Sequence, residues 1–277
     1  IGRYLKERNP DIQIIGADPE GSVYSGGTGR PYLVEGIGED FWPSTYDPSV
    51  VDQVVPISDA VSFATARRVT REEGLLIGGS GGTAVAAALE VAQGLPHDAV
   101  VVVHLPDSGR GYLSKLYDDG WMADHGFLRA AGPTVGDLLR DRPDDLPLLV
   151  HTHPDETVRE AIEILREYEV SQMPVVKHEP PVVLGEVSGA VRERELLKAA
   201  IADPSILDRP VGEVQGPPLP TLGIGEPIDA AAELLGQTTA ALVLDGGHPV
   251  AVVTRSDLLE RLTLRVLVDD HLAADRD

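Results

Sequence analysis

The sequence predicts an α/β protein in two parts: a core built on a parallel sheet and, after it, two copies of a smaller α+β unit. Strand and helix patterns alternate over residues 1–128, as in an α/β layer fold. A succession of strand, helix, strand, strand and helix then occurs twice, at a spacing of about 60 to 70 residues. We place the copies at residues 146–203 and 204–265, after a linker at 129–145 and before a tail at 266–277.

The first part begins with a helix and a buried strand. Residues Gly2–Arg8 have a helical pattern with no N-cap residue before it, so we expect more of this domain to lie upstream of Ile1. The apolar run Ile12–Ala17 ends at Asp18 and Pro19, which predicts a buried strand followed by a turn.

Helices and strands then alternate. Ser58–Glu73 has helical periodicity, with Ser58 or Asp59 as its N-cap. The next elements are a strand at Leu75–Ile77, a helix at Ala84–Gln93 and a strand at Ala99–Leu105. The last strand is apolar on both faces, which is typical of the centre of a parallel sheet.

The two copies of the repeat contain corresponding elements. In the first copy we expect strands at Leu148–His151, Met173–Val176 and Val183–Ser188, with helices from Pro154–Thr157 to Tyr168 and from Glu193 to Ala200. In the second copy we expect strands at Leu219–Leu222, Ala240–Leu244 and Val250–Val253, with helices from Glu226–Asp229 to Leu235 and from Ser256 to Leu262.

Composition excludes several classes of partner and site. The net charge of −22 argues against a nucleic-acid partner, which requires clustered Lys and Arg. The absence of cysteine excludes disulfides and thiolate metal sites, and fits a cytoplasmic location. No apolar run reaches about 18 residues and the N-terminus does not resemble a signal peptide, so we expect no membrane partner.

Glycines and polar residues cluster where two predicted strands end. Gly78–Thr83 precedes a helix, whose N-terminal N–H groups can approach a ligand. Pro106–Gly111, which contains Asp107, follows the next strand, and ligands of parallel sheets bind at the carboxyl ends of strands. A third loop contains Gly36 and Gly38. Each segment is equally compatible with a tight turn that binds nothing.

In this order, the segments resemble the catalytic core of the cystathionine β-synthase family, which belongs to the fold-type II pyridoxal-phosphate (PLP) enzymes. The resemblance covers residues 1 to about 128 and is carried by Ile14–Ser22, Glu35–Phe41, Glu73–Ser80, Leu105–Ser108 and Asp119–Met122. The last two segments favour this family over the related cysteine synthases. The resemblance implies PLP as cofactor and the condensation of L-serine with L-homocysteine to L-cystathionine.

The resemblance also implies a cofactor site formed by Ser80, Gly79, Gly36, Gly38 and Asp107. In the family, the serine at the position of Ser80 bonds to the pyridine nitrogen of PLP. A neutral hydroxyl leaves that nitrogen largely unprotonated, and this weaker electron sink suits β-replacement better than transamination.

No catalytic residue is assigned. The family's Schiff-base lysine lies in a half of the core that this sequence does not contain, so we expect the chain alone to bind no PLP covalently. Lys6 and Lys115 do not occupy that lysine's place and are interpreted as surface residues.

The repeat resembles a CBS-domain pair, the Bateman module that binds adenosyl compounds between its two copies. Thr254 and Asp257 can face one ligand, with the carboxylate accepting from ribose hydroxyls, although both are also good helix-capping residues. The resemblance adds Gln172 and Val170 beside the adenine and implies S-adenosylmethionine as effector. The first copy has Arg192 and Glu195 at the places of Thr254 and Asp257, so we expect one competent cleft.

His151 and His153 have the spacing of two side chains on one face of a strand, which raises the possibility of a metal site. No third ligand is evident in the sequence. We therefore interpret both as surface or core-edge histidines and predict no metal.

Two functions from different classes remain open. The first is the PLP-dependent synthesis of cystathionine from amino-acid substrates, under control of an adenosyl effector, with cysteine synthase as the alternative reaction. The second is a ligand-sensing module without chemistry of its own. The resemblance further implies a homo-oligomer, either a dimer or a tetramer.

Overall fold

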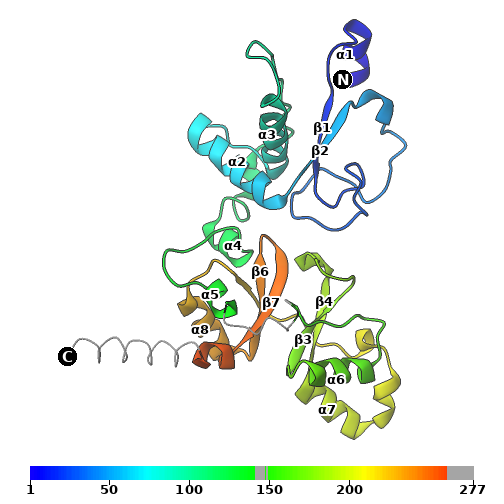
Figure 1. Cartoon of the computed structure of the whole chain (residues 1–277), viewed down its shortest axis with the longest axis vertical. Helices are drawn as coiled ribbons and strands as arrows, with labels where there is room; N and C mark the ends of the chain where they lie inside the picture. The colour runs from blue at the N-terminus through cyan, green and yellow to red at the C-terminus, as the bar shows by residue number, and fades with distance from the viewer. Residues whose placement is uncertain (141–146, 148, 261–277) are drawn as a thin grey trace, which may run out of the picture. The chain divides into compact units, whose positions relative to one another are not determined.

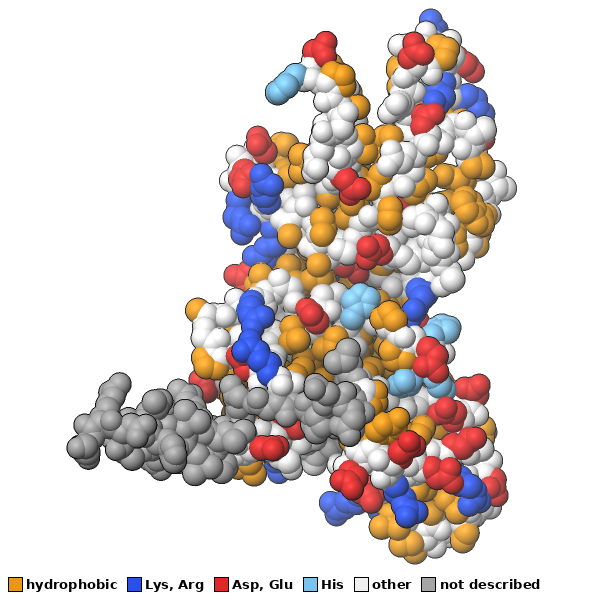
Figure 2. Space-filling model, in the orientation of Figure 1, with side chains coloured by type: hydrophobic (Ala, Val, Ile, Leu, Met, Phe, Trp, Pro, Cys, Tyr) orange, Lys and Arg blue, Asp and Glu red, His pale blue; other side chains and the backbone are white. Residues whose placement is uncertain are grey.

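The computed structural model describes residues 1–140, 147 and 149–260, and it divides into two compact units, Ile1–Trp121 and Met122–Asp277 (Figure 1). The first unit therefore ends a few residues before position 128, where we expected the first part to end. No helix among the described residues is long and apolar enough to cross a membrane. Figure 2 shows acidic side chains scattered over the visible face rather than gathered on one element.

The first unit contains a two-stranded parallel sheet and two long helices, which confirms the predicted α/β class. Its elements are α1 (Gly2–Arg8), β1 (Ile15–Pro19), β2 (Gln53–Ile57), α2 (Asp59–Glu73), α3 (Gly79–Ala92) and the start of α4 (Asp119–Asp124), with 3₁₀ turns at Pro48–Val50 and Gly109–Tyr112. Strand β1 pairs with β2 from Ile15 opposite Gln53 to Pro19 opposite Ile57. A cluster of Val55, Ile57, Ala86 and Ala87 packs α3 onto this sheet.

Helices α2 and α3 pack closely along their N-terminal halves. Ser58 caps α2 by accepting a hydrogen bond from the N–H of Val61. The side chains of Ser62 and Thr83 hydrogen-bond across the contact at 2.8 Å, and both are fully buried. Helix α3 begins inside the glycine cluster, at Gly79, and a side chain at Gly82 would collide with the carbonyl of Ser62. The cluster is therefore the first turn of the helix rather than a loop before it.

Two predicted strands of the first unit do not form. At Leu75–Ile77 only Ile77 makes a β-bridge, to Ser108, and Ala99–Leu105 has no regular structure. Val100 and Val102 are 87% and 88% exposed. A strand needs a neighbour for its backbone hydrogen bonds, and among the described residues of this unit β1 and β2 pair only with each other.

The second unit contains both copies of the repeat. The first copy consists of α6 (Val158–Glu167), β3 (Gln172–Val176), β4 (Val187–Arg192) and α7 (Glu193–Ala202), with 3₁₀ turns at Leu184–Glu186, Pro204–Asp208 and Val211–Glu213. The second consists of α5 (Val135–Leu139), β5 (Thr221–Gly223), α8 (Ile228–Gln237), β6 (Ala240–Asp245), β7 (His248–Thr254) and a helix over 255–260. Strand β3 pairs antiparallel with β4, and the second sheet has the order β5-β6-β7.

Each copy takes part of its core from the segment that precedes the other copy. Val135 and Leu138 pack with α8 and the β5-β6-β7 sheet, whereas Ile206 and Val211 pack with α6 and β3. The N–H of Val135 donates to the backbone carbonyl of Glu226 at 2.8 Å, and the N–H of Val211 donates to the backbone carbonyl of Glu156 at 2.7 Å. The predicted linker at 129–145 is thus wrong in part, because α5 belongs to the core of the second copy.

Other boundaries in the second unit differ from the prediction. The strand expected at Leu148–His151 does not form over its described residues 149–151, and the nearest β-bridge is made by the next residue, Thr152, to Val175. The strand expected from Val183 begins at Val187, after a 3₁₀ turn. The end of the last helix at Leu262, residues 141–145 of the linker and the tail at 266–277 lie outside the described residues.

Candidate functional site

The N-terminus of α3 carries the serine that we singled out. Ser80 is 4% exposed, and its hydroxyl donates to Oδ1 of Asp107 at 3.4 Å. The backbone joins the two segments as well, because the N–H of Gly78 donates to the carbonyl of Asp107. The structure therefore brings Ser80, Gly79 and Asp107 together at one end of α3.

Tyr112 is hydrogen-bonded to the same aspartate, Asp107. Its hydroxyl donates to Oδ2 of Asp107 at 2.6 Å, so each carboxylate oxygen of Asp107 accepts one side-chain hydrogen bond. This hydrogen bond, together with burial and the charges of Asp107 and Glu35, raises the pKa of Tyr112 to about 12. Sequence analysis missed Tyr112, since nothing in its local pattern distinguishes it from the six other tyrosines.

We expect the phenol of Tyr112 to titrate near pH 12 instead of near 10. The neutral phenol is favoured in the folded state, so its contribution to stability is complete below about pH 10 and is lost as the pH rises through about 12. The difference in ultraviolet absorbance between the unaltered chain and Tyr112→Phe isolates this phenol. Asp107→Asn should return the titration toward pH 10, and a difference curve centred on pH 10 in the unaltered chain would contradict the assignment.

Gly36 and Gly38 lie in the loop between β1 and β2. Both have a left-handed backbone, with φ of 83° and 74°, and they line a pocket of about 360 Å³ together with Asp18, Tyr24 and Glu39. A side chain at position 38 would collide with the hydroxyl of Tyr32, whereas position 36 is open. The rings of Tyr24 and Tyr46 stack beside this pocket with centroids 4.5 Å apart.

Of the five predicted cofactor residues, Gly36 and Gly38 line one pocket and Gly79 lines another. The pocket of Gly79 is smaller and is also lined by Tyr112 and by Glu35, the chain neighbour of Gly36. The hydroxyl of Ser80 is buried and its hydrogen bond to Asp107 is long, so it can rotate toward another acceptor. Lys6 pairs with Asp52 at 2.7 Å and Lys115 pairs with Glu35, as expected of surface lysines.

In the second unit, Thr254 and Asp257 form a helix cap. Oδ2 of Asp257 accepts from the N–H of Thr254 at 2.6 Å and from its hydroxyl at 2.8 Å. Thr134 and Asp137 form the same arrangement at the start of α5, where both residues are buried. Asp257 differs in being half-buried, and its Oδ1 accepts no hydrogen bond from the described residues. One carboxylate oxygen is therefore available to a ligand.

Gln172, the first residue of β3, lies beside the end of the β5-β6-β7 sheet that carries Thr254. It is 7% exposed, and its Oε1 accepts a hydrogen bond at 3.1 Å from the hydroxyl of Thr239, which joins the two copies. Thr239 precedes Ala240, whose Cα is opposite that of Thr254 in the β6/β7 ladder. Val170 is half-buried and packs against the core of the first copy.

The corresponding position in the first copy carries a larger side chain, that of Arg192. Arg192, opposite Gln172 in the β3/β4 ladder, forms an ion pair with Glu195 at 3.6 Å and donates to the carbonyl of Pro217 at 3.4 Å. A guanidinium thus occupies the position where Thr254 has a short hydroxyl. This contrast follows the asymmetry between the copies that the sequence indicated.

His151 and His153 are close together, as their spacing predicted, with ring centroids 5.2 Å apart. The structure adds a third residue, Glu179, whose carboxylate lies between the two rings. Burial lowers the pKa of His153, but the carbonyl of Val176 and the carboxylates of Glu179 and Glu156 outweigh it, so the pKa is raised from 6.5. Sequence analysis missed Glu179, which is 26 residues from His153 and comes from another loop.

Comparison with known proteins places both units. Residues 1–107 match the family model "Pyridoxal-phosphate dependent enzyme", and residues 135–202 and 211–264 each match the model of the CBS domain. Cystathionine beta-synthase of Dictyostelium discoideum is 30% identical over 281 residues, which is 95% of this chain and 55% of that protein. The chain thus combines a match to part of the pyridoxal-phosphate dependent enzymes with two CBS domains, and its relatives include cystathionine beta-synthases.

Other relatives match a smaller part of the chain. Cystathionine beta-synthase of Oryctolagus cuniculus is 39% identical over 216 residues, covering 73% of this chain and 38% of that protein. Cysteine synthase of Helicobacter pylori is 43% identical over 115 residues, covering 42% of this chain and 38% of that protein. The chain thus spans between about a third and just over half of the length of these relatives.

Proposed function

We propose that this chain is part of a PLP-dependent enzyme that condenses L-serine with L-homocysteine to L-cystathionine, under control of an adenosyl ligand bound by the CBS pair. The observation that carries the proposal is the order of the family matches, in which a PLP-enzyme match is followed by two CBS domains. In addition, 95% of this chain aligns with a cystathionine beta-synthase. We further propose that the enzyme is a cytoplasmic homo-oligomer.

PLP, when bound, supplies the electron sink for β-replacement at an amino acid. Ser80 would hold its pyridine nitrogen, by turning its hydroxyl from Oδ1 of Asp107 toward that nitrogen. Asp107 would stay in place during this change, because its other oxygen is bound to Tyr112 at 2.6 Å. As a neutral donor, Ser80 leaves the nitrogen largely unprotonated, which favours replacement over transamination.

The reaction is tested on a polypeptide that carries this chain together with the remaining length found in its relatives. Serine plus homocysteine should give cystathionine faster than O-acetylserine plus sulfide gives cysteine. The reverse preference would support the alternative, cysteine synthase, which the similarity to the Helicobacter pylori cysteine synthase favours. A polypeptide that binds adenosyl ligands but turns over neither pair would be a sensing module.

Ser80→Ala in the same polypeptide should lower kcat/KM for cystathionine by up to about tenfold, since it removes one neutral hydrogen bond worth about 0.5–1.5 kcal/mol. The absorbance of bound PLP should shift at the same time, which a purely structural role for Ser80 would not cause. Ser205→Ala is the control, because that hydroxyl donates to Asp203, the residue that caps a 3₁₀ turn in the second unit. Unchanged kinetics and absorbance in Ser80→Ala would refute the assignment.

The adenosyl ligand would bind at Oδ1 of Asp257, which accepts no hydrogen bond from the residues that the structure describes. Thr254 and Asp257 would hold the ribose, while Gln172 and Val170 of the other copy would lie beside the adenine. Calorimetry with S-adenosylmethionine, AMP and ATP identifies the effector, and we expect S-adenosylmethionine to bind most tightly. Equal affinity for all three would mean that the site recognises adenosine alone.

A further inference from the structure

His151 and His153 of the second unit each have one ring nitrogen hydrogen-bonded to a backbone carbonyl. Nδ1 of His151 lies 3.0 Å from the carbonyl of Leu149, and Nδ1 of His153 lies 2.9 Å from the carbonyl of Val176. A carbonyl only accepts, so each Nδ1 must carry the hydrogen. In the neutral ring the lone pair is then on Nε2, which is the arrangement found in most metal-binding histidines.

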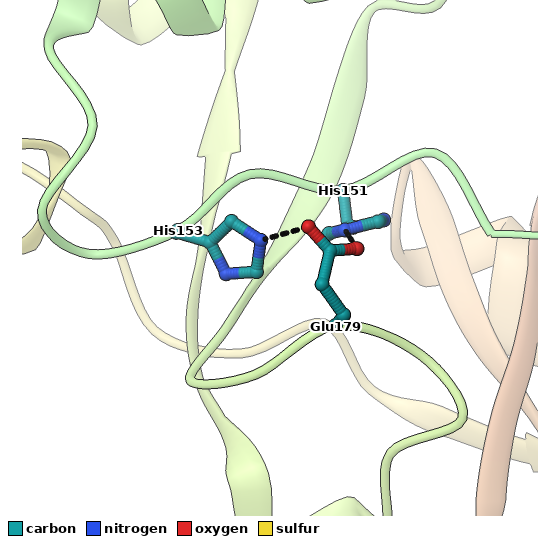
Figure 3. Close-up of side chains that lie close together, drawn as sticks. All are labelled: His151, His153 and Glu179. Atoms are coloured by element: carbon teal, nitrogen blue, oxygen red, sulfur yellow. Dashed lines mark hydrogen bonds and ion pairs between the residues drawn. The ribbon is translucent and has the colours of Figure 1, made fainter.

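The carboxylate of Glu179 lies against Nε2 of both rings, as their hydrogen-bond and ion-pair partner (Figure 3). Its Oε2 lies 3.4 Å from Nε2 of His151, and its Oε1 lies 3.3 Å from Nε2 of His153. Ligand atoms at about 2.0–2.1 Å from a tetrahedral zinc ion are about 3.3–3.4 Å apart. Each separation, one to each oxygen of the carboxylate, has the length of a ligand-to-ligand edge around zinc, and one ligand atom from each of the three residues lies within 4.8 Å of the other two.

The framework behind these side chains is fixed by backbone hydrogen bonds. The N–H of Thr152 donates to the carbonyl of Pro174, and the N–H of Val176 donates to the carbonyl of Thr152. These hydrogen bonds hold residues 151–153 against β3. Oε2 of Glu156 accepts from the N–H of His153 at 2.9 Å and from the hydroxyl of Thr152. The His151 and His153 side chains are 20% and 17% exposed and that of Glu179 is 81% exposed, so an ion can enter from solvent without unfolding.

We propose that His151, His153 and Glu179 form a zinc site with water in the fourth position. Two imidazole nitrogens and one carboxylate oxygen suit zinc, and three protein ligands leave one position open. The site joins the segment before α6 to the loop after β3, so a bound ion holds together two flanks of the first copy. It uses none of the residues assigned to the cofactor or the adenosyl ligand.

The test is calorimetric titration of the untagged chain with zinc chloride at about pH 8. We expect one zinc ion per chain and a higher thermal midpoint of the second unit, which EDTA reverses. Glu179→Gln and His153→Ala should each weaken zinc binding by at least about tenfold. X-ray absorption of the zinc-loaded chain should show two imidazole nitrogens at about 2.0 Å.

Two controls separate this site from surface binding. His97→Ala removes an exposed imidazole of the first unit and should leave the zinc affinity unchanged. Glu179 is so exposed that Glu179→Gln should fold normally, which keeps the test valid if His153→Ala does not. Absence of stoichiometric binding, or equal affinity in Glu179→Gln and the unaltered chain, would overturn the proposal and leave Glu179 as a simple ion-pair partner of the histidines.

Discussion

Replacing Gly82 with alanine is expected to destabilise the first unit by about 1–3 kcal/mol. The new methyl group would collide with the carbonyl of Ser62, and it would lie 2.9 Å from Cβ and 3.0 Å from N of Ala66. These are mainly backbone atoms of α2, so the contact is relieved only if the two helices move apart. Separation would also stretch the buried hydrogen bond between Ser62 and Thr83.

Gly236→Ala is the matched control, since it makes the same chemical change in a helix where the added methyl group meets nothing within 4 Å. Because alanine favours the helix, this variant should be neutral or more stable by up to about 1 kcal/mol. Chemical denaturation followed by circular dichroism gives both free energies of unfolding. If the two substitutions had the same effect, the close packing of α2 on α3 would be disproved.

Replacing Asp257 with alanine is expected to weaken the binding of the adenosyl effector by about ten- to a hundredfold, because a hydrogen bond to a charged group contributes about 1.5–3 kcal/mol. Glu195→Ala, at the corresponding place in the first copy, should change the affinity little, since Arg192 already fills that position. Calorimetry on both variants decides the point. Equal losses, or two strong sites in the unaltered chain, would show that both clefts bind.

The cap formed by Asp257 requires a second control. Asp257 accepts two hydrogen bonds from Thr254, so alanine also removes a helix cap worth about 1 kcal/mol. Asp257→Asn retains an acceptor for the cap but not the charge, and should lose affinity while keeping the thermal midpoint. Asp137→Ala removes the same kind of cap at α5 and should lower stability without affecting the effector. A normal affinity in Asp257→Asn would mean that the residue acts only as a cap.

The sequence by itself determined the elements whose signals are local. Helix α2 begins at its Ser58 cap, and α6 begins where Thr157 and Glu160 form a capping box. The repeat, the asymmetry between Thr254 and Arg192, and the adjacency of His151 and His153 likewise follow from residue order and spacing. Such features depend on interactions a few residues apart, and their geometry is the same wherever the segment is placed in a fold.

Only the tertiary structure decided the features that depend on distant partners. The apolar run Ala99–Leu105 has the composition of a central strand, yet it forms none, because a strand exists only with a neighbour to bond to. The glycine cluster forms the first turn of α3, where α2 leaves no room for a side chain at Gly82. Glu179 joined the two histidines through a loop 26 residues away. Backbone hydrogen bonds and side-chain contacts between remote segments leave no periodic signal, so the sequence supplies the residues and only the fold brings them together.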